Sequence, residues 1–414
     1  MFDAHFHERL PEDVEEVLAS AGIETRRQVL VDRIRNNKIS MDGIPIPTSL
    51  LPRVFPGSYR CVIEDTCRKA TEQHFKWLSS QTDEDVLNGL KLNNALVRVG
   101  VLRNIPDVLT GVIRYDLAVV GEPSISNPPV FIELNALNYH GPAWNHRLPK
   151  AYLEAFPELS DLVDFHDVMS DFDANFSEIA RNKKVLMVIE EDPEYEEYTT
   201  FANEMEARDF QVHVISDNEM KEAVKERRIK MYPDRAIYNG RHYDMLFLRT
   251  YDDTLGVNKN RSVLRNIVQS GVPIHDHPAV LLLEDKLRVA KPVTRRMMKM
   301  LKHNPGSHVL KRRIGSGGRG VYVGYSMTQV LSNINPAKWC IQDRYDFNTT
   351  ETHPTDGDRN KAIIDLAAYF AYKWERGKGL TRGKLSGIMV RSSQTGYVVN
   401  LSSGGCFVPV FYKK

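Results

Sequence analysis

The chain has 414 residues, which is enough for two or three domains that each bury a substantial apolar core. Its 55 lysines and arginines nearly balance its 54 aspartates and glutamates, so the net charge of +1 creates no overall field that would attract nucleic acid or an acidic membrane. No stretch approaches the roughly 20 apolar residues that a membrane-spanning helix requires.

The N-terminus and the cysteines indicate the compartment. The first residues lack the basic segment and apolar run of a secretory signal peptide. The four cysteines are scattered along the chain without the CxxC spacing of a metal or redox site. We therefore expect reduced thiols in a cytoplasmic protein.

The first region, residues 1–180, is predicted to begin with helices and to contain a β-hairpin. Residues 64–78 have helical character, and a second helical stretch is expected over residues 148–180. Between them, residues 108–120 and Val130–Asn135 are predicted to be the two strands of the hairpin.

Polar side chains interrupt this apolar hairpin. Glu133 and Asn135 lie two residues apart in the second strand, so they share one face, and the first strand contributes the carboxylate of Asp116. Carboxylate and amide oxygens are the ligands that Mg²⁺ prefers, usually together with substrate phosphates. A strand edge with solvated polar residues explains this segment equally well when it is considered alone.

The second region, residues 181–282, alternates strands and helices. Strands are predicted over residues 185–189, 211–215 and 244–248, with helices over 195–208 and 263–270. This alternation indicates an open α/β domain with a parallel sheet. An acidic turn replaces the GxGxxG motif after the first strand, which disfavours a nicotinamide or flavin site. His275 and His277 resemble a metal site, but their sequence favours a structural loop end.

The third region, residues 283–414, contains a glycine-rich loop between two strands. Lys311 ends the first strand, and residues 321–323 form the second. Glycines allow backbone N–H groups to approach phosphate oxygens closely, while Lys311 supplies a positive charge. The arrangement differs from a Walker-type loop, which runs from a strand into a helix. An ordinary glycine-rich hairpin is the alternative. The loop residues are Gly315, Ser316, Gly317, Gly318, Arg319 and Gly320.

The rest of the third region is predicted from composition and periodicity. Residues 339–345 form a strand that leads into a hinge, and the polar residues 348–360 form a mobile loop. Residues 361–376, rich in alanine and tyrosine, are predicted to be a helix, and residues 387–391 and 397–401 to be strands.

The order of these motifs resembles that of circularly permuted ATP-grasp ligases, of the kind found in the synthetase domain of glutathionylspermidine synthase. The resemblance extends from about Arg114 to the C-terminus. It implies an ATP-grasp fold in circularly permuted order, with an open parallel α/β domain inserted between the metal-ligand region and the nucleotide lobe. The corresponding segments are 114–116, 133–135, 285–286, 309–320, 341–343, 388–391 and 402–409.

The resemblance also implies roles for individual residues. The metal ligands for Mg²⁺ are Asp116, Glu133 and Asn135, and the catalytic arginines are Arg114 and Arg391, which hold the phosphoryl group and a carboxylate. The ATP-binding residues are Lys286, Lys311, the glycine-rich loop, Gln342, Asp343 and Tyr345. A surface charge without a catalytic role is the alternative for each lysine and arginine, and it weighs most for Lys286, Arg319 and Arg391.

The implied reaction is ATP-dependent ligation of a carboxylate to an amine through an acyl phosphate. Residues 139–147 differ from the threonine- and proline-containing segment of the glutathionylspermidine enzymes, which favours another amino acid or small peptide as substrate. His140 and His146 in this segment are open candidates for substrate contacts. The alternatives are an ATP-dependent small-molecule kinase and a nucleotide-binding regulator without turnover. A homodimer is the default assembly for an enzyme of this size.

Overall fold

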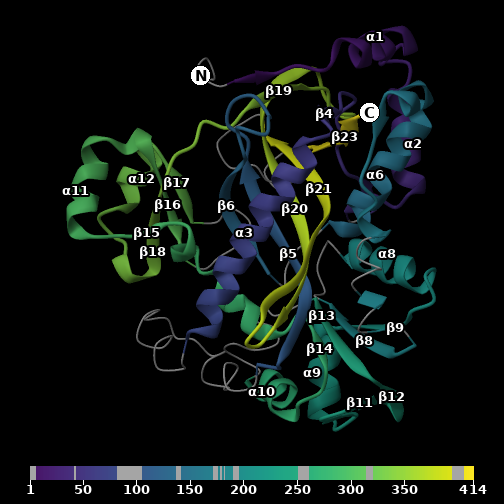
Figure 1. Ribbon diagram of the computed structural model, residues 1–414, viewed down its shortest axis with the longest axis vertical. Coiled ribbons are helices and arrows are strands. Elements are labelled where there is room, and N and C mark those ends of the chain that lie inside the picture. The colour runs from purple at the N-terminus through teal and green to yellow at the C-terminus, as the bar shows by residue number, and fades with distance from the viewer. Residues whose placement is uncertain are drawn as a thin grey trace.

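The chain forms a mixed α/β structure in which a central sheet is flanked by helices, a parallel α/β unit and a smaller lobe (Figure 1). The computed structural model describes residues 6–41, 43–81, 105–136, 141–170, 176–177, 180, 182–189, 195–249, 261–313, 320–393 and 405–414. No helix within these ranges combines the length and the apolar character needed to cross a lipid bilayer.

The central sheet has seven strands and is mostly antiparallel. Its long strand β20 pairs with β21 along one edge, and with β19 and β5 one after the other along the opposite edge. Strand β6 continues the sheet beyond β5, so the predicted hairpin is confirmed. The strands are β1 (His7–Glu8), β5 (Val108–Ala118), β6 (Val130–Asn135), β19 (Thr349–Thr352), β20 (Asn360–Glu375), β21 (Gly379–Ser393) and β22 (Phe407–Val408).

The helix predicted over residues 361–376 is wrong, because this segment is strand β20. Its alanines and tyrosines suggested a helix, but the middle of the strand, from residue 362 to residue 372, is buried without interruption. A central strand that is covered on both faces becomes a continuous apolar run and loses the alternation that would identify it. Residues 348–360, predicted to be a loop, also contain the short strand β19.

Two helices cover opposite faces of the central sheet. Helix α3 (Tyr59–Ser79) packs on one face, where Thr71 Oγ1 lies 2.7 Å from Tyr115 Oη. Helix α6 (Pro142–Ala155) packs on the other face, where Trp144 contacts Phe407 with ring centroids 5.8 Å apart. The helix predicted at residues 148–180 therefore begins earlier and is interrupted after Ala155 by a 3₁₀ turn, η1 (Pro157–Asp161). Residues 168–170, 176–177 and 180 are helical again.

The N-terminal elements are held by strands from the far end of the chain. Strand β23 lies between β4 and β7, and β1 pairs with β19. Glu8 of β1 also forms a buried ion pair with Arg53 of β4, with 2.6 Å between Arg53 Nε and Glu8 Oε2. The elements are α1 (Glu12–Ala21), α2 (Arg27–Asn36), β2 (Ser40–Met41), β3 (Ile44–Pro45), β4 (Arg53–Phe55), β7 (Val163–Asp164) and β23 (Val410–Lys413).

The second region forms the predicted parallel α/β unit. Its four-stranded sheet has the order β14-β13-β8-β9, and all three pairings are parallel. A separate antiparallel sheet consists of β10, β11 and β12. The elements are β8 (Lys184–Ile189), α8 (Tyr195–Glu206), β9 (Gln211–Ser216), α9 (Asp217–Lys225), β10 (Ile229–Tyr232), β11 (Arg235–Tyr238), β12 (Arg241–Tyr243), β13 (Met245–Arg249), α10 (Arg261–Ser270) and β14 (Ile274–His275).

The small lobe lies beside β6 at the left of Figure 1 and contains the strands on both sides of the glycine-rich loop. Its antiparallel sheet has the order β15-β18-β16-β17. Residues 397–401, predicted to be a strand, lie outside the described residues. Its elements are η3 (Lys286–Arg288), β15 (Lys291–Pro292), α11 (Arg295–His303), η4 (Pro305–Ser307), β16 (His308–Arg312), β17 (Val321–Val323), α12 (Tyr325–Val330), η5 (Pro336–Lys338) and β18 (Trp339–Asp343). The preceding η2 (Pro278–Glu284) packs into the core between α3 and the central sheet.

The sequence His275-Asp276-His277 joins the α/β unit to the central sheet. Asp276 Oδ1 accepts a hydrogen bond from the backbone N–H of Val112 in β5 (3.1 Å), and His277 Nδ1 accepts one from Ala279 N–H (3.2 Å). Within the described part of the chain, no three His, Cys, Asp or Glu side chains are grouped as a metal site. The hydrogen bonds of Asp276 and His277 support the structural loop end that the sequence favours.

Burial makes stability depend on pH at His277. Burial lowers the pKa of this imidazole to about 4, whereas the unfolded chain has an ordinary histidine pKa of about 6.5. The unfolded state therefore binds more protons between these values, and stability falls as the pH drops through this window. In His277→Asn, the amide oxygen can still accept the Ala279 N–H but does not titrate. We expect the variant to lose less unfolding free energy between about pH 7 and pH 5, by about 2 kcal/mol, in urea denaturation. Equal losses in both proteins would contradict this account.

Candidate functional site

One face of the central sheet carries a row of polar side chains. Asp116 in β5 is directly opposite Glu133 in β6, and Arg114 is directly opposite Asn135. Residues that are paired in this way project from the same face of a sheet, and here this is the face away from α3. Asn135 Nδ2 lies 3.4 Å from Asp116 Oδ2.

The row continues across the two long strands. Asp365 of β20 is paired with Arg391 of β21, and its carboxylate accepts hydrogen bonds from Nε (3.1 Å) and Nη2 of the guanidinium. Arg391 Nη2 also lies 3.2 Å from Asp116 Oδ2, and Arg114 Nε donates to Asp116 Oδ1 at 2.9 Å. All four residues are more than nine-tenths buried, so two arginines and two aspartates form a neutral network inside the protein.

The two aspartates differ in their proton affinity. Burial raises the pKa of the Asp116 carboxyl, but the guanidinium groups of Arg114 and Arg391 more than offset this effect, and the pKa lies below its ordinary value. Burial raises the pKa of Asp365 to about 6, and the nearby charge of Asp116 adds to the increase. Asp116 therefore stays ionised, while Asp365 is the more easily protonated member of the network.

Asp365 was not predicted as a site residue. It lies in the segment that was predicted to be a helix, so its pairing with Arg391 could not be deduced. The aspartate in an otherwise apolar segment could nevertheless have indicated a site, because a buried carboxylate requires a charged or hydrogen-bonding partner.

Glu133 faces two lysines from another part of the chain. Lys286 Nζ, in η3, and Lys311 Nζ, in β16, each lie 3.7 Å from Glu133 Oε2. Both lysine side chains are less than 10% exposed, whereas the Glu133 side chain is 24% exposed. Burial lowers the pKa of Lys311, although Glu133 acts in the opposite direction. Two buried lysines lie beside one carboxylate here, and closely spaced ammonium groups of this kind favour an anion such as phosphate.

A buried ion pair beneath this cluster fixes the position of Lys286. Arg313 Nη2 donates to Asp285 Oδ2 at 2.6 Å, and Arg313 Nε donates to Oδ1 at 3.2 Å. The backbone N–H of Lys286 donates to the carbonyl oxygen of Arg313 at 3.0 Å. The pair therefore holds η3 against the end of β16, a role that was not predicted for Arg313.

The three ATP-binding residues expected at the end of β18 differ in their exposure and in their contacts. Gln342 is buried, and its Nε2 donates to the carbonyl oxygen of Ile132 in β6 (3.2 Å), so the small lobe contacts the hairpin here. Asp343, the last residue of β18, is exposed and lies 3.5 Å from both Lys291 and His308. Tyr345 follows the strand and is half-buried. The structure brings Gln342 to the hairpin and leaves Asp343 facing the surface of the small lobe.

Most of the glycine-rich loop lies outside the described residues, namely Gly315, Ser316, Gly317, Gly318 and Arg319. Gly320 is described and has a φ of 81°, and a Cβ at this position would lie 2.7 Å from Arg312 Cγ. A side chain there would be strained both in the backbone and by contact. The carbonyl oxygen of Gly320 accepts a hydrogen bond from Arg312 N–H (3.0 Å), so this last residue of the loop lies beside the residue that follows Lys311.

The oxygen donors of the hairpin fit a magnesium ion. Two carboxylates and one amide project from the same face of neighbouring strands, and the chemistry of this set is that of a hard-cation site. In the structure, the arginine and lysine side chains satisfy the carboxylates of Asp116 and Glu133. A bound cation would replace part of this positive charge. The arrangement can thus bind a cation and a polyphosphate next to each other.

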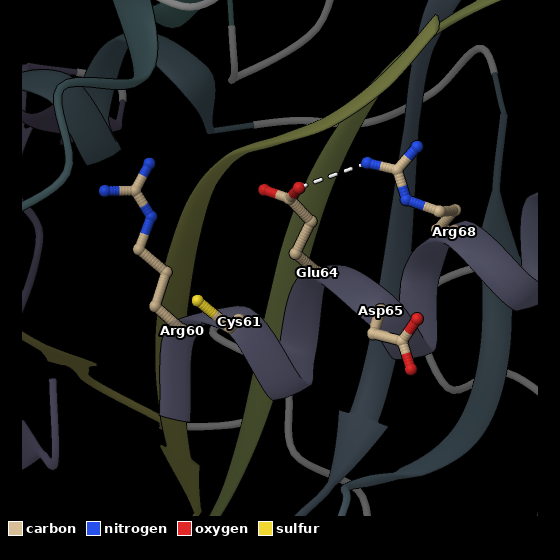
Figure 2. A pocket seen from close by; sticks show the side chains of 5 residues that line it. All are labelled: Arg60, Cys61, Glu64, Asp65 and Arg68. Atoms are coloured by element: carbon tan, nitrogen blue, oxygen red, sulfur yellow. Dashed lines mark hydrogen bonds and ion pairs between the residues drawn. The ribbon is translucent and has the colours of Figure 1, made fainter. Parts of the chain in front are cut away.

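A separate hollow of about 470 Å³ lies along α3 (Figure 2). Its polar groups anchor the helix to β21: Arg68 Nη2 donates to the carbonyl oxygen of Gly383 (2.6 Å), and Glu64 Oε2 accepts from Leu385 N–H (3.2 Å). Because α3 covers the other face of the sheet, this hollow is not part of the polar row. Its lining residues are Arg60, Cys61, Glu64, Asp65 and Arg68.

Comparison with known proteins identifies a related fold. No family model matches the sequence, and no curated protein matches it either. Among solved structures, a glutathione synthetase-like effector from Globodera pallida, in its apo form, matches with a TM-score of 0.66 and 13% sequence identity, covering 98% of each chain. The chain therefore shares the fold of a glutathione synthetase-like protein, and the match does not point to glutathionylspermidine synthase in particular.

The lysine cluster leads to a prediction about nucleotide binding. Lys311→Met removes one of the two buried cations that face Glu133, so we expect ATP affinity in the presence of Mg²⁺ to fall about tenfold or more, as measured by isothermal titration calorimetry. The matched control is Lys299→Met, which removes an exposed lysine from the same lobe and should leave the affinity unchanged. Equal affinities in all three proteins would exclude Lys311 from the phosphate site.

Proposed function

We propose that this protein is an ATP-dependent carboxylate–amine ligase with a circularly permuted ATP-grasp fold. One observation carries the proposal: Glu133 of the hairpin lies 3.7 Å from both Lys286 and Lys311, which come from the third region of the chain. Oxygen ligands for a cation and buried positive charge for phosphates thus occur at one place, as binding of magnesium and a triphosphate requires. The shared fold with a glutathione synthetase-like protein agrees with this proposal.

In the proposed complex, Asp116, Glu133 and Asn135 hold Mg²⁺, which neutralises phosphate charge when it is bound. Lys286 and Lys311 bind the phosphate oxygens of ATP from the opposite side. The backbone N–H groups of the glycine-rich loop cover the phosphates, and Gln342, Asp343 and Tyr345 line the place of the adenine ring. The parallel α/β unit of residues 181–282 is then an insertion between the metal-ligand region and the nucleotide lobe.

The reaction consists of two transfers. A carboxylate oxygen of an amino acid or small peptide attacks the γ-phosphorus of ATP, and ADP leaves. An amine then attacks the carbonyl carbon of the acyl phosphate, loses a proton and expels inorganic phosphate, so that an amide remains. Arg114 and Arg391 orient the anionic groups, because guanidinium groups bind both carboxylate and phosphate oxygens. Positioning and fixed charge supply the rate enhancement without a protein nucleophile.

A nucleotide-binding regulator without turnover is the second candidate. The observation that favours it is the neutral network around Asp116, in which Arg114 and Arg391 engage both carboxylate oxygens. A metal ion must compete with these arginines for Asp116. If it does not succeed, the protein binds ATP through its lysines but does not transfer the phosphoryl group.

An assay with pooled substrates separates these functions. The purified protein is incubated with ATP, Mg²⁺ and a mixture of amino acids and small peptides, with and without hydroxylamine. A ligase releases ADP, yields a hydroxamate with hydroxylamine and forms a new amide that mass spectrometry detects. A kinase releases ADP and yields a stable phosphorylated product without hydroxamate. A regulator binds ATP without releasing ADP, which would contradict the proposal.

Glu133→Gln tests the role of the hairpin. The substitution keeps the size of the side chain but removes the charge that a cation requires, so we expect ADP release to fall by about a hundredfold or more. Circular dichroism should show an unchanged fold, because Glu133 is partly exposed. Glu122→Gln, an exposed glutamate between the two hairpin strands, is the control and should keep full activity. Wild-type turnover in Glu133→Gln would remove the metal assignment.

A further inference from the structure

The network around Arg391 contains one acidic residue that the proposed reaction does not use. Asp365 is 7% exposed, lies in the middle of the central sheet and is not one of the predicted metal ligands. It is paired in register with Arg391 and accepts hydrogen bonds from Nε and Nη2 of that guanidinium. A bidentate contact of this kind fixes both the position and the orientation of an arginine.

The contact determines which edge of the guanidinium remains for a ligand. The Asp365 carboxylate accepts hydrogen bonds from Nε and Nη2 of Arg391, and Nη2 also lies 3.2 Å from Asp116 Oδ2. The hydrogen bonds among the described residues involve no acceptor for Nη1 of Arg391. The guanidinium therefore presents Nη1, next to Nη2, on the side where Asp116 and the hairpin lie.

The balance of charge changes when a cation binds. In the structure, two arginines are balanced by Asp116 and Asp365. A cation that uses Asp116 withdraws that carboxylate from the arginines, and Asp365 becomes the remaining anion that holds Arg391. The Nη1 and Nη2 donors facing Asp116 are then available to another anion. Without Asp365, Arg391 would have only Asp116 as a partner and would compete with the cation for it.

We propose that Asp365 is a positioning residue: it fixes the guanidinium of Arg391 through Nε and Nη2, so that Arg391 keeps its place when a cation takes Asp116 and its Nη1 edge points toward the phosphoryl group or carboxylate in transfer. This inference rests on the proposed function and adds a residue to it. The hydrogen bonds to Nε and Nη2 and the pairing across β20 and β21 are its structural basis.

Orthovanadate, an analogue of the transferred phosphoryl group, is the probe for the Arg391 edge. Calorimetry measures first the affinity for ADP with Mg²⁺, and then the affinity of the ADP-saturated protein for orthovanadate. We expect Asp365→Asn to bind ADP within about twofold of the wild type but orthovanadate about tenfold or more weakly, because charge-assisted hydrogen bonds depend on the position of the donor.

A double substitution distinguishes positioning from a general loss of structure. If Asp365 acts through Arg391, Asp365→Asn combined with Arg391→Gln should bind orthovanadate as weakly as Arg391→Gln alone. Asp365→Glu retains the charge and should restore part of the affinity, which also provides a test if Asp365→Asn does not fold. Glu8→Gln is the matched control, because it removes a buried carboxylate that pairs with Arg53 outside this network.

The outcomes separate the two proposals. A wild-type protein that does not bind ADP with Mg²⁺ would refute the proposed function, and this inference with it. If the wild type binds ADP but not orthovanadate, or if Asp365→Asn binds orthovanadate as tightly as the wild type, the positioning role is overturned while nucleotide binding stands.

Discussion

The structure depends on the burial of two arginine–aspartate pairs in one sheet. Charged groups inside a protein are tolerated only when each is paired and hydrogen-bonded, and removing one partner commonly costs about 3–5 kcal/mol. Asp116 comes from a strand far along the sequence from the consecutive strands that carry Asp365 and Arg391, so their pairing fixes how β5, β20 and β21 align. A shift of one residue would turn these side chains into the apolar layer beneath α3, which makes other registers unfavourable. Because these buried charges must be paired, the two arginines and two aspartates project from the same face of the sheet as Glu133 and Asn135 of the hairpin.

Three parts of the molecule meet at this face. The central sheet supplies the aspartates and arginines, the hairpin supplies Glu133, and the third region supplies Lys286 and Lys311. The contact between Gln342 and the backbone of Ile132 joins the small lobe directly to β6. The lobe has its own apolar core and its own four-stranded sheet, so its lysines are held by a framework separate from that of the carboxylates. Opposite charges on two such frameworks can hold a ligand between them.

The sequence was sufficient to predict the parts of the fold that have a clear local pattern. The hairpin with Glu133 and Asn135 alternates polar and apolar residues, and the parallel α/β unit alternates strands and helices, so both were predicted correctly. Strand β20 was predicted to be a helix because both of its faces are buried and alternation is lost. Asp365 was missed for the same reason, since its role depends on the neighbouring strand. The contacts of Lys286 and Lys311 with Glu133 join residues more than 150 positions apart, which no local pattern can reveal.

Strand β23 has a consequence for how the protein is made. Its residues Val410–Lys413 pair with Arg53–Phe55 on one side and with Val163–Asp164 on the other. Because a ribosome releases the chain from the N-terminus onward, β4 must wait for its partner until all the residues between Phe55 and Val410 have been synthesised. The apolar side of α3 also stays uncovered until β20 and β21 emerge. The nascent polypeptide thus exposes aggregation-prone surface for most of its translation, and we expect its yield in cells to depend on chaperones that bind such intermediates.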